Sequence, residues 1–337
     1  MPEEPKSADE LSIEVKDLSK SYGQVVALRG VSFNVRKGEV VGFLGPNGAG
    51  KSTTLRILCG LLPATSGIAK VCGISLALDP LRARKHIGFM PENNPLPEEL
   101  RVIEYLRLRA HLKDLRGKTL KQRVEDVMDL CDLRRKARRK LIGSLSKGYR
   151  QRVGIADAIL ARPDVAILDE PTIGLDPHQV LVIRQLIAQL KGKMSIIISS
   201  HILPEIELSC DRIIIMNNGR LVAIGTPAQL RKEFISHQTY IVEASGDMEK
   251  LSGELQTRFP SLKIDIEPIE GCEFRRLTLR TDEASDLSAE LLSAAVSQKA
   301  STTRSLFRRE STLEDVFLAA TQRNWDIVGE THEPSVR

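Results

Sequence analysis

The chain has 337 residues, 28% of them charged and 42% hydrophobic, and its 49 basic and 44 acidic side chains leave a net charge of +5. This composition is ordinary for a globular protein with enough apolar material for a core, and so small a basic excess argues against nucleic acid as a partner. The length indicates two domains, or one large domain with an appendage.

Neither the cysteines nor the start of the chain indicates an exported or membrane-spanning protein. The five cysteines are scattered without a CxxC pair, which fits a reducing cytosol and supports neither a zinc site nor a disulfide framework. Residues 1–11 are acidic and polar, so we expect a polar leader rather than a signal peptide. No segment reaches the ~18–20 apolar residues of a membrane span, and we expect any spans to belong to another chain.

Residues 12–236 are predicted to form an α/β domain. Apolar residues first alternate as in strands, and a continuous apolar run then indicates a buried parallel strand. Two later apolar strands lie between helical stretches, which favours a sheet with helices on both faces. The main expected elements are strands at 13–15, 31–35, 40–44, 165–168 and 194–198 and a helix at 51–61.

A glycine-rich turn joins the strand at 40–44 to the helix that follows. It fits the pattern G-x-x-x-x-G-K-[ST] in the required context, after a buried strand and before a helix. Backbone N–H groups of such a loop turn towards phosphate oxygens, and the helix adds the positive end of its dipole. We expect Lys51 to reach the β- and γ-phosphates of ATP and Ser52 to bind Mg²⁺; the alternative is a glycine turn with an incidental lysine. The loop residues are Gly45, Pro46, Asn47, Gly48, Ala49, Gly50, Lys51, Ser52 and Thr53.

Residues 98–160 interrupt the alternation of strands and helices. They are rich in Leu and Arg and helical in pattern throughout, so we predict a helical subdomain inserted in the sheet domain. Within it, residues 134–140 hold six bases in seven positions. This basic run is either a solvated face or a surface for anionic headgroups or an acidic loop of a membrane partner.

Two carboxylates follow the strand at 165–168. Asp169 can anchor Mg²⁺ through water, and Glu170 can polarise an attacking water as general base. Alone, an Asp-Glu pair after a strand often only caps a loop. The pair gains weight here because a phosphate loop precedes it and Pro171-Thr172 follows.

Residues 237–321 predict a second domain of different character. Their strands and helices follow the order β-α-β-β-α-β, a small α+β unit of the ferredoxin-like kind. A final helix at 312–321 precedes a polar tail, 322–337, that we expect to be disordered. The strands are expected at 238–246, 262–269, 273–281 and 303–308 and the helices at 248–259 and 283–300.

The segment Leu-Ser-Lys-Gly-Tyr-Arg-Gln-Arg at 145–152 resembles the signature sequence of ATP-binding cassette (ABC) proteins, usually written LSGGQ. Other motifs of that family stand in its order: Tyr22, an aromatic that stacks on adenine; Asp176, in the D-loop; and His201, the switch histidine. The resemblance covers roughly residues 12–230. It implies the fold of an α/β phosphate-loop NTPase, an ABC nucleotide-binding domain with an inserted helical subdomain.

The resemblance also implies how the motifs cooperate. In this family the signature binds the ATP held by the phosphate loop of a partner subunit, so two subunits head to tail enclose two ATP molecules. Ser146 and Gly148, where a helix begins, would hold the γ-phosphate, and His201 would contact it together with the attacking water. Taken alone, Tyr22 is more often a packing residue, and His201 a satisfied core histidine.

Three residues depart from the family pattern. Lys147 and Tyr149 replace the second glycine and the final glutamine of the signature, and Glu92 stands where the family usually has the glutamine of its Q-loop. A carboxylate can still meet Mg²⁺ or water through oxygen. We therefore expect activity to be kept and count Glu92 among the ATP-binding and metal-binding residues.

The string Pro-Glu-Asn-Asn-Pro at 91–95 and the signature together resemble the exporter branch that pairs with ABC-2 type permeases, and within it the gliding-motility-associated ATPases. This implies a separate membrane permease, a second nucleotide-binding subunit (we expect a copy of the chain, with a paralogue as the alternative), and a place on the cytoplasmic face of the cell membrane. The alternative is a soluble cassette ATPase that regulates another process. A single phosphate loop and a short insert without heptads or CxxC argue against ribosome-acting and chromosome-acting types.

Overall fold

The structure, a computed structural model, describes residues 10–235, 237–283, 285–297 and 301–322. The chain divides into two compact units, Met1–Pro227 and Ala228–Arg337. Most of the predicted leader and nearly all of the predicted tail lie outside the described residues, and Leu11 already begins the first strand. No described helix is both long and apolar enough to cross a bilayer.

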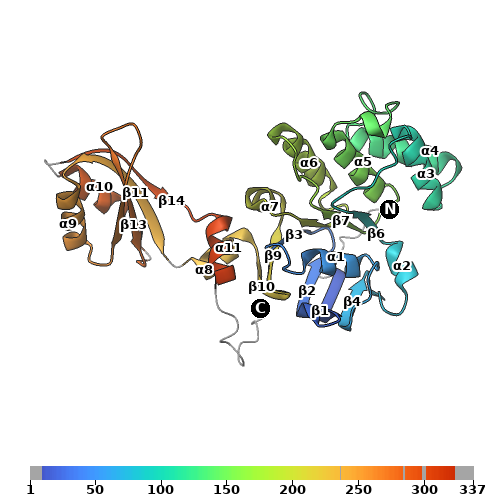
Figure 1. Cartoon of the computed structure of the whole chain (residues 1–337), viewed down its shortest axis with the longest axis horizontal. Helices are drawn as coiled ribbons and strands as arrows, with labels where there is room; N and C mark the ends of the chain where they lie inside the picture. Colours follow the sequence, from blue (N-terminus) through green and yellow to red (C-terminus); the bar gives the residue numbers. More distant parts are fainter. Residues whose placement is uncertain (1–9, 236, 284, 298–300, 323–337) are drawn as a thin grey trace, which may run out of the picture. The chain divides into compact units, whose positions relative to one another are not determined.

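A six-stranded sheet in the order β10-β9-β3-β8-β7-β6 forms the centre of the first unit (Figure 1). All neighbours are parallel except β10, which pairs antiparallel with β9. Strands β3, β7 and β8 are buried along their whole length, as their continuous apolar sequences predict. The carboxyl ends of the parallel strands therefore share one edge of the sheet and their amino ends the other. The strands are β3 (Val40–Leu44), β6 (Ile87–Met90), β7 (Val165–Asp169), β8 (Ser195–Ser199), β9 (Arg212–Asn217) and β10 (Arg220–Gly225).

A second, antiparallel sheet in the order β2-β1-β4-β5 packs over this one. Alternating apolar side chains of β1 and β2 enter a core shared with β3 and the first helix, and the rings of Phe33 and Phe43 meet edge to face at 5.2 Å. Polar contacts join the sheets as well, since Ser12 Oγ lies 2.8 Å from Ser195 Oγ. The strands are β1 (Leu11–Tyr22), β2 (Val25–Arg36), β4 (Ser66–Val71) and β5 (Ile74–Ser75).

Helices α3, α4 and α5 intervene between β6 and β7 and contact one another (Figure 1). The prediction that 98–160 is helical throughout is wrong for residues 131–146, which form turns and one short 3₁₀ helix, η1 (Ile142–Ser144). There the backbone pairs across the segment: the N–H groups of Ile142 and Gly143 donate to the carbonyls of Leu100 and Glu98. The helices of this unit are α1 (Lys51–Leu58), α2 (Pro80–Arg84), α3 (Val102–Leu112), α4 (Gly117–Leu130), α5 (Lys147–Ile159), α6 (Pro177–Leu190) and α7 (Leu203–Ser209).

Helix α5 lies directly on β6 and on the loop that follows it. A Cβ atom on Gly88 of β6 would clash with the carbonyl oxygen of Ala158, and one on Gly154 would lie 2.5 Å from the amide nitrogen of Asn94. Asn94 also donates from Nδ2 to the carbonyl of Arg150 at 2.8 Å. The helix, the strand and the loop are therefore in contact without intervening bulky side chains.

The second unit contains an antiparallel sheet in the order β12-β13-β11-β14. The predicted succession β-α-β-β-α-β is confirmed, and apolar side chains such as Tyr240, Leu251 and Leu277 form its core. Helix α10 begins later than predicted, because the N–H of Leu287 bonds the Tyr240 hydroxyl instead of continuing a helix. The elements are α8 (Pro227–Phe234), β11 (Gln238–Gly246), α9 (Met248–Arg258), β12 (Lys263–Pro268), β13 (Arg275–Thr281), α10 (Ser288–Ser297), β14 (Ser301–Arg309) and α11 (Leu313–Gln322).

Candidate active site

The phosphate loop connects β3 to α1 at the carboxyl edge of the parallel sheet. Gly48 and Gly50 have φ angles of 81° and 99°, values that favour glycine. A Cβ atom on Gly50 would lie 2.7 Å from a methyl carbon of Leu28, so the loop also presses against β2. No side chain caps α1, which leaves its first N–H groups without a side-chain acceptor and suited to an anion.

Lys51 is buried in the first turn of α1 and folds back over its own loop. Its Nζ donates to the carbonyls of Gly45 and Pro46 at 2.6 and 3.2 Å. Burial lowers the pKa of Lys51, and the carboxylates of Glu170, Asp169 and Glu92 offset part of that effect. The ammonium group thus lies in the field of the predicted carboxylates while it is bonded to backbone oxygens of the loop.

Asp169 and Glu170 are both buried at the end of β7, and a serine of the neighbouring strand holds them. The Ser199 hydroxyl donates to Asp169 Oδ1 at 2.6 Å and accepts the Glu170 N–H at 2.9 Å. Sequence reasoning missed Ser199, because a serine that ends a strand is common. The available signal was its place directly after a strand expected to be buried and two residues before His201.

Glu170 and His201, the two residues predicted to be catalytic, contact each other: Oε2 of Glu170 lies 2.8 Å from Nδ1 of His201. The glutamate side chain is 11% exposed and that of the histidine 55%. Glu170 has a φ of 50°, which is uncommon for a residue other than glycine and is found preferentially at functional sites. A buried carboxylate, that of Glu170, therefore contacts an imidazole that is exposed to solvent, that of His201.

Glu92 and the start of α5 line a cavity of about 330 Å³, together with Arg150, Gln151 and Ile173. Ser146 occupies the N-cap position of α5 and makes no side-chain cap hydrogen bond there. Gly148 is buried, and a Cβ atom on it would lie 2.5 Å from the amide oxygen of Gln179. A larger residue at this position of the signature would displace the Gln179 side chain.

Lys147 and Tyr149, the two residues that depart from the signature, make contacts with different parts of the chain. Lys147 lies against Gly174 of the D-loop, since a Cβ atom on that glycine would clash with its Nζ. The ring of Tyr149 packs under the guanidinium of Arg152, 4.0 Å from the ring centroid. Arg152 is buried and pairs with Asp132 at 2.9 Å. Tyr149 thus belongs to the packing of the helical segment.

Other candidate residues are not brought together in this chain. Tyr22 is exposed at the end of β1, with the Lys20 ammonium 5.2 Å from its ring centroid. Asp176 caps α6 and accepts the N–H of Gln179 at 3.0 Å. Across the part of the chain that the structure describes, no hydrogen bond or ion pair joins Tyr22, Ser146 or Asp176 to the phosphate loop.

Comparisons with known proteins bear on the same residues. Residues 28–173 match the family model described as ABC transporter. The chain is 33% identical over 317 residues to the Nod factor export ATP-binding protein I of Ralstonia nicotianae, which covers 92% of this chain and 94% of that protein. It is 40% identical over 215 residues to the uncharacterized ABC transporter ATP-binding protein YhcH of Bacillus subtilis, covering 63% and 69%. A solved dimeric ATP-binding cassette in a post-hydrolysis state, bound to ADP and phosphate, has a TM-score of 0.58 at 27% identity, covering 64% of this chain and 98% of that one.

These matches confirm the α/β cassette fold and the ATPase activity that the motifs predicted. The alignment with the Nod factor export protein covers 92% of the chain and therefore includes most of the second unit. The chain belongs to the family of ABC transporter ATP-binding proteins and is an ABC-type ATPase.

Proposed function

We propose that the chain hydrolyses ATP with Glu170 as general base and thereby drives export through a separate ABC-2 type permease. The contact between Glu170 and His201 carries the catalytic part of this proposal. The imidazole orients a buried carboxylate at the sheet edge where the phosphate loop lies. A carboxylate so placed can take a proton from water, which is typically worth ~10² to 10⁴ in rate.

Mg²⁺ fits the donors at this edge. It prefers hard oxygen ligands and keeps several waters, and the side chains present are the Ser52 hydroxyl, the buried Asp169 carboxylate and the Glu92 carboxylate. The ion would neutralise phosphate charge when bound. Ser199 holds Asp169 by one oxygen and leaves the other available, while Lys51 can leave its loop carbonyls for the phosphates.

We further propose that Ser146 completes the ATP site of a second copy. In support, Ser146 begins a helix with no side-chain cap, and a related cassette of solved structure is dimeric. Mixing a Lys51→Ala chain with a Ser146→Arg chain then leaves one intact site in each heterodimer. ATPase activity is expected to exceed that of either variant alone. No gain in activity, with heterodimers demonstrated by differently tagged chains, contradicts the head-to-tail arrangement.

The basic run at 134–140 is proposed to dock the ATPase at the membrane. It contains two kinds of base. Arg138 holds Glu125 by hydrogen bonds of 2.5 and 2.6 Å, and Arg134 holds Asp129 at 2.7 Å. The other four are exposed, and within the described residues none has an acidic partner: Arg135, Lys136, Arg139 and Lys140.

The four unpaired bases are the ones to test. Near an anionic surface each basic side chain contributes roughly 1 kcal/mol, screened over about 8 Å at physiological salt. Replacing all four by Gln should lower recovery with membranes and abolish its salt dependence, while ATPase activity stays constant. The charge-matched control replaces Lys250, Arg258, Lys263 and Arg275 of the second unit. Equal recovery of both variants at low salt would mark the run as a solvated face.

The remaining assignments concern domains and partner. The strand order of the second unit supports a ferredoxin-like domain at 237–321, and α3, α4 and α5 support a helical subdomain at 98–160 within the ATPase domain 12–236. Location on the cytoplasmic face of the membrane follows from the proposed permease. Purification of the tagged chain from detergent-solubilised membranes should recover an integral membrane protein, and recovery without one contradicts the transport role.

A further inference from the structure

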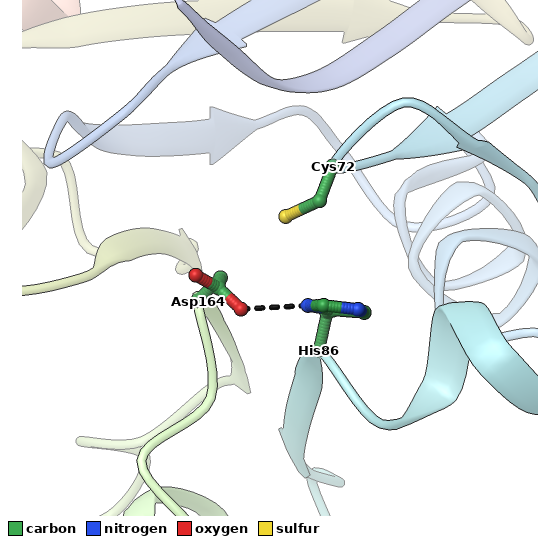
Figure 2. A group of neighbouring side chains, drawn as sticks. All are labelled: Cys72, His86 and Asp164. Atoms are coloured by element: carbon green, nitrogen blue, oxygen red, sulfur yellow. Dashed lines mark hydrogen bonds and ion pairs between the residues drawn. The ribbon is translucent and has the colours of Figure 1, made fainter.

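Three side chains with metal-binding atoms converge at the amino edge of the parallel strands (Figure 2). Cys72 Sγ, a His86 ring nitrogen and an Asp164 carboxylate oxygen all lie within 4.8 Å of one another. Nδ1 of His86 lies 2.7 Å from Oδ2 of Asp164. In the described ranges no other trio of His, Cys, Asp or Glu side chains is grouped in this way.

The backbone of each of these residues is fixed by a strand. His86 and Asp164 directly precede β6 and β7, and the N–H of Val165 donates to the His86 carbonyl at 3.0 Å. The N–H of Ser195 donates to the Asp164 carbonyl at 2.9 Å. Cys72 lies in the turn between β4 and β5, where its N–H donates to the Ser12 carbonyl at 2.8 Å. The cluster therefore rests on rigid elements, which is a condition for a preorganised site.

The donor set fits one class of ion. Thiolate, imidazole and carboxylate together suit Zn²⁺, which takes four tetrahedral ligands at ~2.0–2.3 Å. Such bonds place neighbouring ligand atoms about 3.4 Å apart, which lies within the 4.8 Å that bounds the observed cluster. Mg²⁺ and Ca²⁺ prefer oxygen ligands, so the thiol argues against them.

A nucleophilic Cys-His-Asp relay is the main alternative, and two observations disfavour it. In such a relay the histidine contacts the acid through one ring nitrogen and the nucleophile through the other. In Figure 2 the sulfur of Cys72 lies above the Nδ1 end of the ring, the same end that faces Asp164. Burial and the Asp164 carboxylate also raise the pKa of Cys72, which opposes an activated thiol.

We propose that Cys72, His86 and Asp164 bind a zinc-type divalent cation, with water as the fourth ligand. The ion would join the β4–β5 turn of the antiparallel sheet to β6 and β7 of the parallel sheet, across the core between them. Asp164 is exposed and Cys72 and His86 are half-buried, so an ion can reach the cluster from solvent. Spacing along the chain argued against a zinc site because no CxxC pair exists, but these ligands come from three separate segments.

Cobalt is the probe of choice, because a cysteine-bound Co²⁺ shows thiolate-to-metal charge-transfer absorption. Titration of the nucleotide-free chain with Co²⁺ should produce this band, and Zn²⁺ should displace it. Cys72→Ser should abolish it. The matched control is Cys272→Ser, which removes an exposed thiol of the second unit and should leave the band unchanged. Absence of the band in the unaltered chain, or its loss in Cys272→Ser alone, overturns the proposal.

The other two ligands provide a test that keeps the thiol. Loss of even an outer partner of a metal ligand typically costs about 10- to 100-fold in affinity, so His86→Gln and Asp164→Asn should each weaken Co²⁺ binding at least tenfold. Zn²⁺ should raise the thermal midpoint of the unaltered chain and not that of these variants. ATP binding at the opposite edge reports whether each variant is folded. Unchanged Co²⁺ affinity in folded variants contradicts the site.

Discussion

An aspartate and a serine lie at each end of the neighbouring strands β7 and β8, and their hydrogen bonds differ between the two ends. The pairs are Asp169 with Ser199 and Asp164 with Ser195. At the carboxyl ends, Ser199 bonds the side chain of Asp169 and the backbone of the catalytic candidate Glu170. At the amino ends, Ser195 bonds the other sheet and the backbone that follows it: its hydroxyl accepts from the Ser12 hydroxyl at 2.8 Å and from the Gly38 N–H at 3.0 Å, and donates to the Arg36 carbonyl at 3.1 Å. In parallel sheets, ligands bind outside the carboxyl ends. A serine hydroxyl therefore holds the candidate catalytic residues at one edge and joins the two sheets at the other.

Glu170→Gln should have the largest effect of the changes that test this contrast. The amide keeps the size of the side chain but cannot accept a proton, so the ATPase rate should fall by ~10² to 10⁴ while ATP binding persists. Steady-state turnover and nucleotide binding are measured with the membrane partner present. Glu254→Gln, on the exposed face of α9, is the control and should leave turnover unchanged. Near-normal turnover in Glu170→Gln removes the general-base assignment.

Ser199→Ala should come next. It leaves a buried carboxylate oxygen of Asp169 without its partner, a penalty of about 1–3 kcal/mol, while the N–H of Glu170 keeps its hydrogen bond to the Ser199 carbonyl at 3.2 Å. If the same free energy is lost from the transition state for hydrolysis, turnover should fall by roughly 5- to 150-fold. Thermal unfolding is measured alongside turnover. A variant with full activity and reduced stability alone would show that Ser199 is structural, like Ser195.

Ser195→Ala is the paired change at the other edge. It also removes a buried hydroxyl with several partners, so the free energy of unfolding should fall by about 1–3 kcal/mol. Turnover per folded molecule should not change, because the strand spans some 16 Å between the two edges. Denaturant unfolding measures the free energy of unfolding, and ATPase assays on the same samples measure turnover per folded molecule. Slower turnover in fully folded Ser195→Ala would contradict the view that the amino edge contributes to stability alone.

Asp164→Asn in metal-free protein should have the smallest effect. The carboxylate is 54% exposed and its partner His86 35%, and solvent-exposed pairs of this kind contribute about 0–1 kcal/mol. After chelator treatment, the stability of the variant should therefore lie close to that of the unaltered chain. A large loss of stability in the absence of metal would show that Asp164 stabilises the fold without an ion.

The sequence predicted well those features that are contiguous. Strands β3, β7 and β8, the helix after the glycine-rich loop and the order of elements in the second unit depend on local patterns, whereas β6 and β9 were not predicted. The turns at 131–146 were mistaken for helix, because Leu and Arg suit helices and the pairing of Ile142 with Leu100 is not local. Glu170 and His201 were each predicted, whereas their contact depends on β7 and β8 lying side by side.

Residues that act together from distant segments escaped prediction for the same reason. Ser199 acquires its role from its register opposite Asp169 on the neighbouring strand. Cys72, His86 and Asp164 are joined only when two sheets pack and β6 pairs with β7. A scan for close cysteine pairs cannot find such a cluster, because each ligand stands alone in its own segment.

The contact of α5 with β6 has a mechanical consequence. Glycine at position 88 brings β6 against the backbone of α5, and glycine at position 154 brings α5 against the Asn94 side chain, so little space is left to absorb a displacement of the helix. Asn94, bonded to α5, lies two residues from Glu92 in the same loop. We therefore expect a displacement of α5 to be passed to the loop that carries Glu92, through two glycines that lie outside the phosphate loop.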